Sequence, residues 1–143
     1  MAISDDFCIL VVEDRPDDVF VLKRAFQEAG LSRPLVVACD GEEALNYLDG
    51  CTGPQSSETV STPALMLLDL KMPRVSGFEI VSWVRNNRYF SHLPIIVFSD
   101  SDEASDIDRA LGLGASDYRV KPTKPEDFVA FVKEIAESLP CGA

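Results

Sequence analysis

Short runs of apolar residues alternate along this chain with stretches in which apolar residues recur every three or four positions. The short runs are rich in Val, Ile and Leu, and such continuous runs predict strands that are covered on both faces. The predicted strands are residues 7–12, 35–39, 65–68, 93–98 and 115–120.

The stretches between the strands have the spacing of amphipathic helices, with charged residues on the opposite side. Gly30 and Gly50 follow two of them and are typical helix stops. The predicted helices are residues 18–29, 44–48, 77–88, 104–111 and 128–139. Strand and helix alternate throughout, which predicts an α/β fold with a parallel sheet and right-handed crossovers.

The length of 143 residues suits one domain with a substantial core. We expect a single domain over residues 1–143, with its core at about 7–138, and no output domain. A polar segment at 50–63, rich in Gly, Pro, Ser and Thr, interrupts the alternation. It predicts a surface insertion that leaves the core intact.

The composition limits the function classes. The net charge of −11 opposes binding to nucleic acid and to anionic membrane surfaces. No apolar run approaches the roughly 20 residues of a membrane helix. The amino terminus also has no basic start followed by a long apolar block, the pattern of a signal peptide. These features predict a cytoplasmic protein without a nucleic-acid or membrane partner.

The four cysteines, Cys8, Cys39, Cys51 and Cys141, are widely spaced. In the cytoplasm they are expected to be free thiols and not a metal site. Cys8 and Cys39 lie within predicted strands and are expected to be small core residues.

Polar side chains follow the predicted strands at the point where each strand ends. Glu13 and Asp14 follow the first strand, Asp69 the third, Ser99 the fourth and Lys121 the fifth. The carboxyl ends of parallel strands form the ligand-binding edge of such a sheet. Three carboxylates brought together there need a cation, and Mg²⁺ suits a site with few protein ligands. A lysine and a hydroxyl beside them favour phosphoryl transfer to a carboxylate, here Asp69.

The motifs at these positions resemble the receiver domain of two-component response regulators. They are Val11-Val12-Glu13-Asp14, Leu67-Leu68-Asp69-Leu70-Lys71-Met72-Pro73, Ser76-Gly77-Phe78-Glu79, Phe98-Ser99, Gly114-Ala115-Ser116-Asp117-Tyr118 and Val120-Lys121-Pro122. Their order and identity together make the resemblance strong. It implies a flavodoxin-like (βα)5 sandwich with a five-stranded parallel sheet in the order 2-1-3-4-5.

The resemblance also implies a role for each site residue. Asp69 would be phosphorylated, and Mg²⁺, with Mn²⁺ as a substitute, would be held by Glu13, Asp14, Asp69 and the backbone carbonyl of Lys71. Ser99 and Lys121 would bind the phosphoryl group. Tyr118, unless it is only a half-buried strand residue, would turn inward as Ser99 moves.

Further positions would modulate or shape the site. Asp100, Ser101 and Lys71 are the modulating residues, and the Lys121–Pro122 bond would be cis. Asp100 departs from the family pattern, in which a small residue follows the hydroxyl. We expect its carboxylate to narrow access and repel an incoming phosphodonor, although it could instead orient water or Mg²⁺, or turn outward without effect.

The partners implied are a sensor histidine kinase or phosphotransfer protein, and a downstream protein or second copy bound at the face of residues 104–111, 115–120 and 128–139. The segment 13–18 and the loop at 50–63 resemble single-domain regulators of phytochrome-like kinases. His92 lies in a predicted loop, which makes it a poor phosphotransfer histidine. The chain would be a phosphoacceptor that assists its own phosphorylation and dephosphorylation, and not an enzyme.

Three other functions fit these residues less well. An Asp-nucleophile phosphatase needs a second Asp two residues after the nucleophile, where this chain has Lys71. A flavin carrier of the same fold needs a phosphate cradle after the first strand, where this chain is acidic. A receiver-like module without phosphorylation would not need the full set of acid, hydroxyl and lysine residues.

Overall fold

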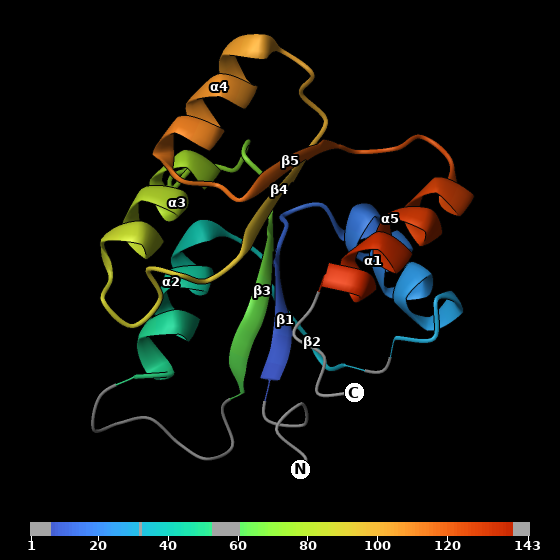
Figure 1. The fold of residues 1–143 in the computed structure, drawn as a ribbon, viewed down its shortest axis with the longest axis horizontal. Helices are drawn as coiled ribbons and strands as arrows, with labels where there is room; N and C mark the ends of the chain where they lie inside the picture. The colour runs from blue at the N-terminus through green and yellow to red at the C-terminus, as the bar shows by residue number, and fades with distance from the viewer. Residues whose placement is uncertain (1–6, 32, 53–60, 139–143) are drawn as a thin grey trace.

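The fold is a five-stranded parallel sheet between two layers of helices (Figure 1). The computed structural model describes residues 7–31, 33–52 and 61–138; Cys141 and most of the 50–63 segment lie outside them. The strand order is β2-β1-β3-β4-β5, and every pair is parallel, which confirms the predicted fold class. The strands are β1 (Phe7–Val12), β2 (Leu35–Ala38), β3 (Thr62–Leu68), β4 (Ile95–Ser99) and β5 (Asp117–Val120).

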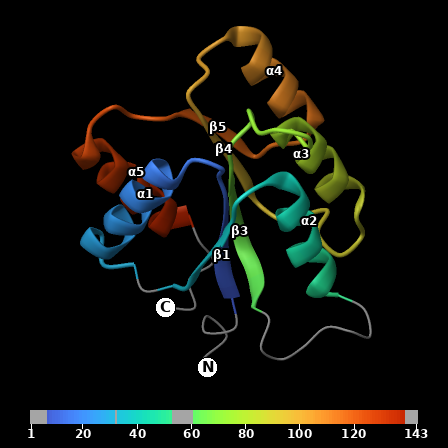
Figure 2. The same ribbon diagram turned by 180° about the vertical axis from the view of Figure 1, so that it is seen from behind.

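The helices are divided between the two faces of the sheet. Helices α1 (Pro16–Glu28) and α5 (Pro125–Ser138) cover one face, and α2 (Gly41–Gly50), α3 (Gly77–Asn86) and α4 (Ala104–Leu113) cover the other (Figure 2). None of the described helices has the length and apolar content to span a bilayer.

Successive residues of the central strands point to opposite layers, so the core has two halves. Leu10 and Val12 of β1 pack toward α2 and α3, whereas Ile9 and Val11 pack toward α1 and α5. β3 is buried over its last six residues, consistent with its central place. Each fully buried side chain of this kind contributes about 1.5–3 kcal/mol to stability, which makes the sheet a rigid support for the residues at its edge.

Several element bounds differ from the prediction by one to three residues. Helix α1 begins at Pro16 and not at Asp18, because a proline is well suited to the first position of a helix. β5 begins at Asp117 and not at residue 115. Ser116 instead joins α4 to β4, with its backbone N–H donating to the carbonyl of Ile95 at 2.8 Å and its hydroxyl accepting from the N–H of Ile95 at 3.1 Å.

One cysteine was misplaced by the prediction. Cys8 is fully buried, as expected, but Cys39 is exposed. It follows the last residue of the edge strand β2, and its backbone N–H donates to Glu43 Oε1 at 3.1 Å as α2 begins. The prediction was wrong because the strand ends one residue earlier and the chain turns there toward solvent.

Candidate functional site

The parallel sheet brings the five predicted site residues to one edge. Glu13 and Asp14 follow β1, Asp69 follows β3, Ser99 is the last residue of β4 and Lys121 follows β5. Ladder hydrogen bonds extend into the loops, since the N–H of Asp69 donates to the carbonyl of Val12 at 3.0 Å and the N–H of Lys121 to that of Ser99 at 2.7 Å. The sheet itself therefore positions the site.

Glu13, Asp14 and Asp69 form a compact acidic cluster. One carboxylate oxygen from each lies within 4.8 Å of the others. Burial and, to a smaller degree, the charge of Asp69 raise the pKa of Glu13 to about 7, although Lys121 opposes the shift. Burial also raises the pKa of Asp69, with Lys121 opposing and Asp14 adding to the shift. The ionised cluster is thus unfavourable without a further positive charge.

The donor set fits a hard divalent cation such as Mg²⁺. All three groups are carboxylates, which supply the oxygen ligands that Mg²⁺ prefers. Among the described residues, Asp14 Oδ1 is the buried side-chain oxygen or nitrogen that has no hydrogen-bond partner. A cation bound between the carboxylates would satisfy this oxygen.

Lys121 supplies the buried positive charge of the site. Its side chain is 2% exposed, which excludes a solvated lysine. Nζ donates to Glu13 Oε1 at 2.6 Å and to Asp18 Oδ2 at 2.8 Å, and lies 3.9 Å from Asp69 Oδ1. Burial lowers the pKa of Lys121, but the hydrogen bonds with Asp18 and Glu13 outweigh it and leave that pKa raised, so the side chain stays charged.

The Lys121–Pro122 bond is trans, and the structure has no cis peptide bond among the residues it describes. The prediction of a cis bond was therefore wrong. With the trans bond, the lysine still reaches the carboxylates of Glu13 and Asp18.

Ser99, Ser101 and Tyr118 are linked by hydrogen bonds. The fully buried Ser99 hydroxyl accepts from the N–H of Ser101 at 3.2 Å, and the Tyr118 hydroxyl donates to the carbonyl of Ser101 at 2.8 Å. The ring of Tyr118 packs against the core layer under α2, α3 and α4. A change at Ser99 can thus reach Tyr118 through one intervening residue.

Lys71 joins the loop after β3 to α4. Its Nζ lies 3.2 Å from Asp106 Oδ2, and the same oxygen accepts from the Ser101 hydroxyl at 2.6 Å. These two contacts, with Ser101 the stronger, hold the pKa of Asp106 below its usual value. The Lys71 side chain therefore points to α4, and its backbone carbonyl as a metal ligand stays a prediction.

Gly77 allows α3 to begin directly beside Asp69. Its N–H donates to the carbonyl of Leu70 at 2.9 Å, and a Cβ at this position would overlap the backbone oxygen of Asp69 and lie 2.7 Å from Leu70 Cα. Such close approach of two backbones requires glycine.

Two charged residues at the site were not predicted as site residues. Asp18 binds Lys121, and Arg15 Nη1 forms an ion pair of 2.7 Å with Asp100, the residue after Ser99. Both lie in the acidic segment after β1. The sequence signal for Asp18 was its position in the first turn of α1, because that helix starts at this edge of the sheet.

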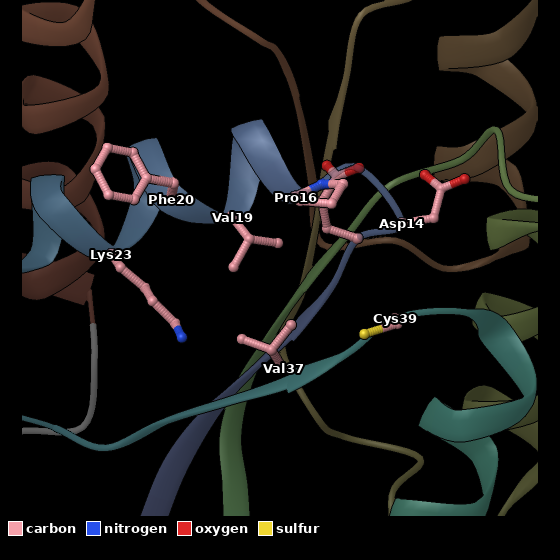
Figure 3. A pocket seen from close by; sticks show the side chains of 8 residues that line it. Asp14, Pro16, Val19, Phe20, Lys23, Val37 and Cys39 are labelled. Carbon is pink, nitrogen blue, oxygen red and sulfur yellow. The ribbon is translucent and has the colours of Figure 1, made fainter.

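A pocket of about 300 Å³ lies beside Glu13 and Asp14, between α1 and the edge strand β2. Figure 3 shows Val19 and Phe20 of α1 on one side and Val37 and Cys39 on the other. Asp14 lines it, but Asp69 does not. The pocket therefore adjoins the candidate site without enclosing the central carboxylate.

The family model described as the response regulator receiver domain matches residues 9–133 of this chain. The chain belongs to the response regulator receiver family. This match and the parallel sheet confirm the resemblance drawn from the sequence, and they make the chain a phosphoacceptor signalling protein of the two-component type.

Individual proteins are also similar to most of this chain. The probable methanogenesis regulatory protein FilR2 of Methanothrix harundinacea is 33% identical over 134 residues, which cover 94% of this chain and 84% of that protein. This chain spans only 40% and 47% of the length of two longer curated relatives.

Two solved receiver structures superpose closely. Response regulator RPA3017, in red light signaling of R. palustris, has a TM-score of 0.85 and 32% identity, with 96% of each chain covered. The phosphorylated cyanobacterial phytochrome response regulator RcpA has a TM-score of 0.82 and 28% identity, with 94% of this chain and 99% of that chain covered.

Proposed function

We propose that Asp69 accepts a phosphoryl group from a phosphohistidine of a partner kinase or phosphotransfer protein. A carboxylate oxygen of Asp69 would form the new bond to phosphorus as the phosphorus–nitrogen bond breaks, and the leaving imidazole nitrogen would keep the electron pair. The observation that carries this proposal is the cluster of Asp69 with Glu13 and Asp14, in which Asp69 Oδ1 lies 3.9 Å from the ammonium of Lys121.

The other site residues would each perform one task in this reaction. Glu13, Asp14 and Asp69, with the Lys71 carbonyl, would hold Mg²⁺, which when bound supplies positive charge to the phosphoryl oxygens. Lys121 would hold one phosphoryl oxygen, since its Nζ lies 3.9 Å from Asp69 Oδ1 and has a third N–H donor besides the two that bind Glu13 and Asp18. The Ser99 hydroxyl, which accepts from the N–H of Ser101, would shift to donate its own hydrogen to another phosphoryl oxygen.

The output would be a change in a protein-binding surface. Tyr118 and Ser101 connect Ser99 to β5 and to the start of α4, so the face formed by α4, β5 and α5 is the proposed docking surface for a target or a second copy. RPA3017 acts in red light signaling and RcpA is a phytochrome response regulator, which supports a phytochrome-like histidine kinase as the proposed partner. The cytoplasmic location stays a prediction.

The test is the intact mass of the protein after incubation with acetyl phosphate. We expect one added phosphoryl group in the presence of Mg²⁺, and its loss in Asp69→Asn and in a chelator. Asp102→Asn is the control, because Asp102 is exposed and follows the same edge of the sheet. Equal labelling of Asp69→Asn would contradict the proposal, and no labelling of the wild type would favour a receiver-like module without phosphorylation.

A further inference from the structure

Asp18 is the second hydrogen-bond partner of Lys121. An ammonium has three N–H donors. Two of them are used by Glu13 Oε1 at 2.6 Å and Asp18 Oδ2 at 2.8 Å, whereas Asp69 Oδ1, at 3.9 Å, is beyond hydrogen-bond distance. The lysine is therefore held by carboxylates other than the one proposed to accept the phosphoryl group.

The fold fixes the position of Asp18. It lies in the first turn of α1, where the helix dipole favours a negative charge, and its side chain is 19% exposed. Leu22 and Phe26 bury the inner face of the same helix. A competing cation, Arg15, is 59% exposed and its Nε is 3.7 Å away, so Lys121 is the nearer partner of this carboxylate.

Asp18 is not among the residues of the acidic cluster, which consists of Glu13, Asp14 and Asp69 in the described part of the chain. The nearest partner of its carboxylate in the site is Lys121 Nζ, at 2.8 Å, so Lys121 is the group through which we expect it to act. This separates its role from that of a metal ligand.

We propose that Asp18 is a positioning residue that holds the Lys121 ammonium back from Asp69 and so weakens the binding of a phosphoryl group there. The inference rests on the proposed function of Asp69. A charged hydrogen bond to a phosphoryl oxygen needs a separation of about 2.7–2.9 Å, and any shift of the ammonium toward such an oxygen lengthens its hydrogen bond with Asp18. The negative charge of Asp18 opposes that shift, and an uncharged side chain of the same shape opposes it less.

The experiment measures the binding of beryllium fluoride, a mimic of the phosphoryl group, by calorimetry at saturating Mg²⁺. Asp18→Asn keeps the shape of the side chain and removes its charge. Asp17→Asn is the matched control, because it removes the same charge from the neighbouring, exposed residue of the same helix turn. We expect Asp18→Asn to bind about three- to tenfold more tightly than Asp17→Asn.

A second pair of variants separates positioning from a purely structural role. Asp18→Glu restores the carboxylate and is expected to return the affinity to within about twofold of the wild type. Asp18→Ser also removes the charge, with a short polar side chain of intermediate helix propensity. It is expected to bind more tightly, as Asp18→Asn does, and it replaces Asp18→Asn if that variant does not fold.

The inference is overturned if Asp18→Asn binds no more tightly than Asp17→Asn, or if Asp18→Glu behaves as Asp18→Asn does. Failure of the proposed function has a different signature. In that case the wild type itself does not bind beryllium fluoride, or Asp69→Asn binds it equally well.

Discussion

The Tyr118 hydroxyl donates to the backbone carbonyl of Ser101 at 2.8 Å, and the N–H of the same serine donates to the buried Ser99 hydroxyl at 3.2 Å. The aromatic residue of β5 is therefore tied to the hydroxyl at the end of β4 by a single residue. Because a ligand shifts a conformation only through contacts that differ between two states, this chain of bonds is a physical route for such a shift.

The first prediction concerns this route. Tyr118→Phe removes the bond to Ser101, and we expect smaller amide chemical-shift changes in α4 and β5 when beryllium fluoride and Mg²⁺ are added, with a stability loss of about 1 kcal/mol. NMR spectra of the labelled protein measure the shifts. Tyr89→Phe is the control, because Tyr89 is 60% exposed. Shift changes in α4 and β5 equal to those of the wild type would show that the signal does not use this bond.

The second prediction concerns Gly77, where α3 touches the backbone of Asp69. Gly77→Ala forces that backbone to move, and we expect a loss of stability of about 1–3 kcal/mol and much slower phosphorylation by acetyl phosphate. Gly112→Ala is the control, because a Cβ there meets nothing within 4 Å. Thermal unfolding and intact mass report the two effects. Identical behaviour of the two variants would mean that the contact at Asp69 is easily relieved.

The third prediction concerns Asp100. The Asp100 carboxylate is the smallest of the causes that raise the pKa of Asp69. The same carboxylate forms an ion pair of 2.7 Å with Arg15. We expect Asp100→Ala to speed phosphorylation by acetyl phosphate about twofold at low ionic strength, because the pairing leaves a small repulsion. Arg15→Gln should have the opposite effect.

Both effects should shrink as salt is added, since the two side chains are exposed. Rates at matched Mg²⁺ occupancy are the measurement. Faster phosphorylation in both variants, or a gain in Asp100→Ala that persists at high salt, would exclude an electrostatic effect.

The fourth prediction concerns pH. The pKa of Glu13 is about 7 in the folded protein and about 4.5 in the unfolded chain, so between these values the folded state holds a proton that the unfolded state has lost. In a chelator, the free energy of unfolding should therefore decrease by roughly 1–3 kcal/mol as the pH rises from about 4.5 to 7.

Glu13→Gln removes this group and should flatten the pH dependence over the same range. Urea unfolding at several pH values, with and without Mg²⁺, provides the measurement. A dependence as steep in Glu13→Gln as in the wild type would assign it to another group, with Asp69 the first to test because its pKa is raised in the same direction.

The sequence predicted the sheet and the residues at its edge because both depend on local patterns. Continuous apolar runs such as that of β3 mark buried strands, and the polar residue after each run then falls at the ligand-binding edge. Glu13, Asp69, Ser99 and Lys121 were found in this way, and the structure brings them together.

Contacts between segments far apart in the sequence could not be predicted in this way. Lys121 and Asp18 are 103 positions apart, and the sheet, with α1 packed beside α5, brings them together. Arg15 and Asp100 meet across two loops whose conformations carry no periodic signal. The exposed Cys39 was misplaced because the end of a short edge strand is poorly defined by its residue types.

Helix α4 buries a single residue, Ala110, of its ten. Its other contacts include the stacking of the Arg109 guanidinium over Phe78 at 4.1 Å and the polar contacts of Asp106 with Ser101 and Lys71. A helix that buries so little apolar surface unfolds locally at a lower free-energy cost than helices that bury a full apolar stripe. Its amide hydrogens should therefore exchange with solvent well before those of α3, and a phosphorylation worth only a few kcal/mol would suffice to reorganise it.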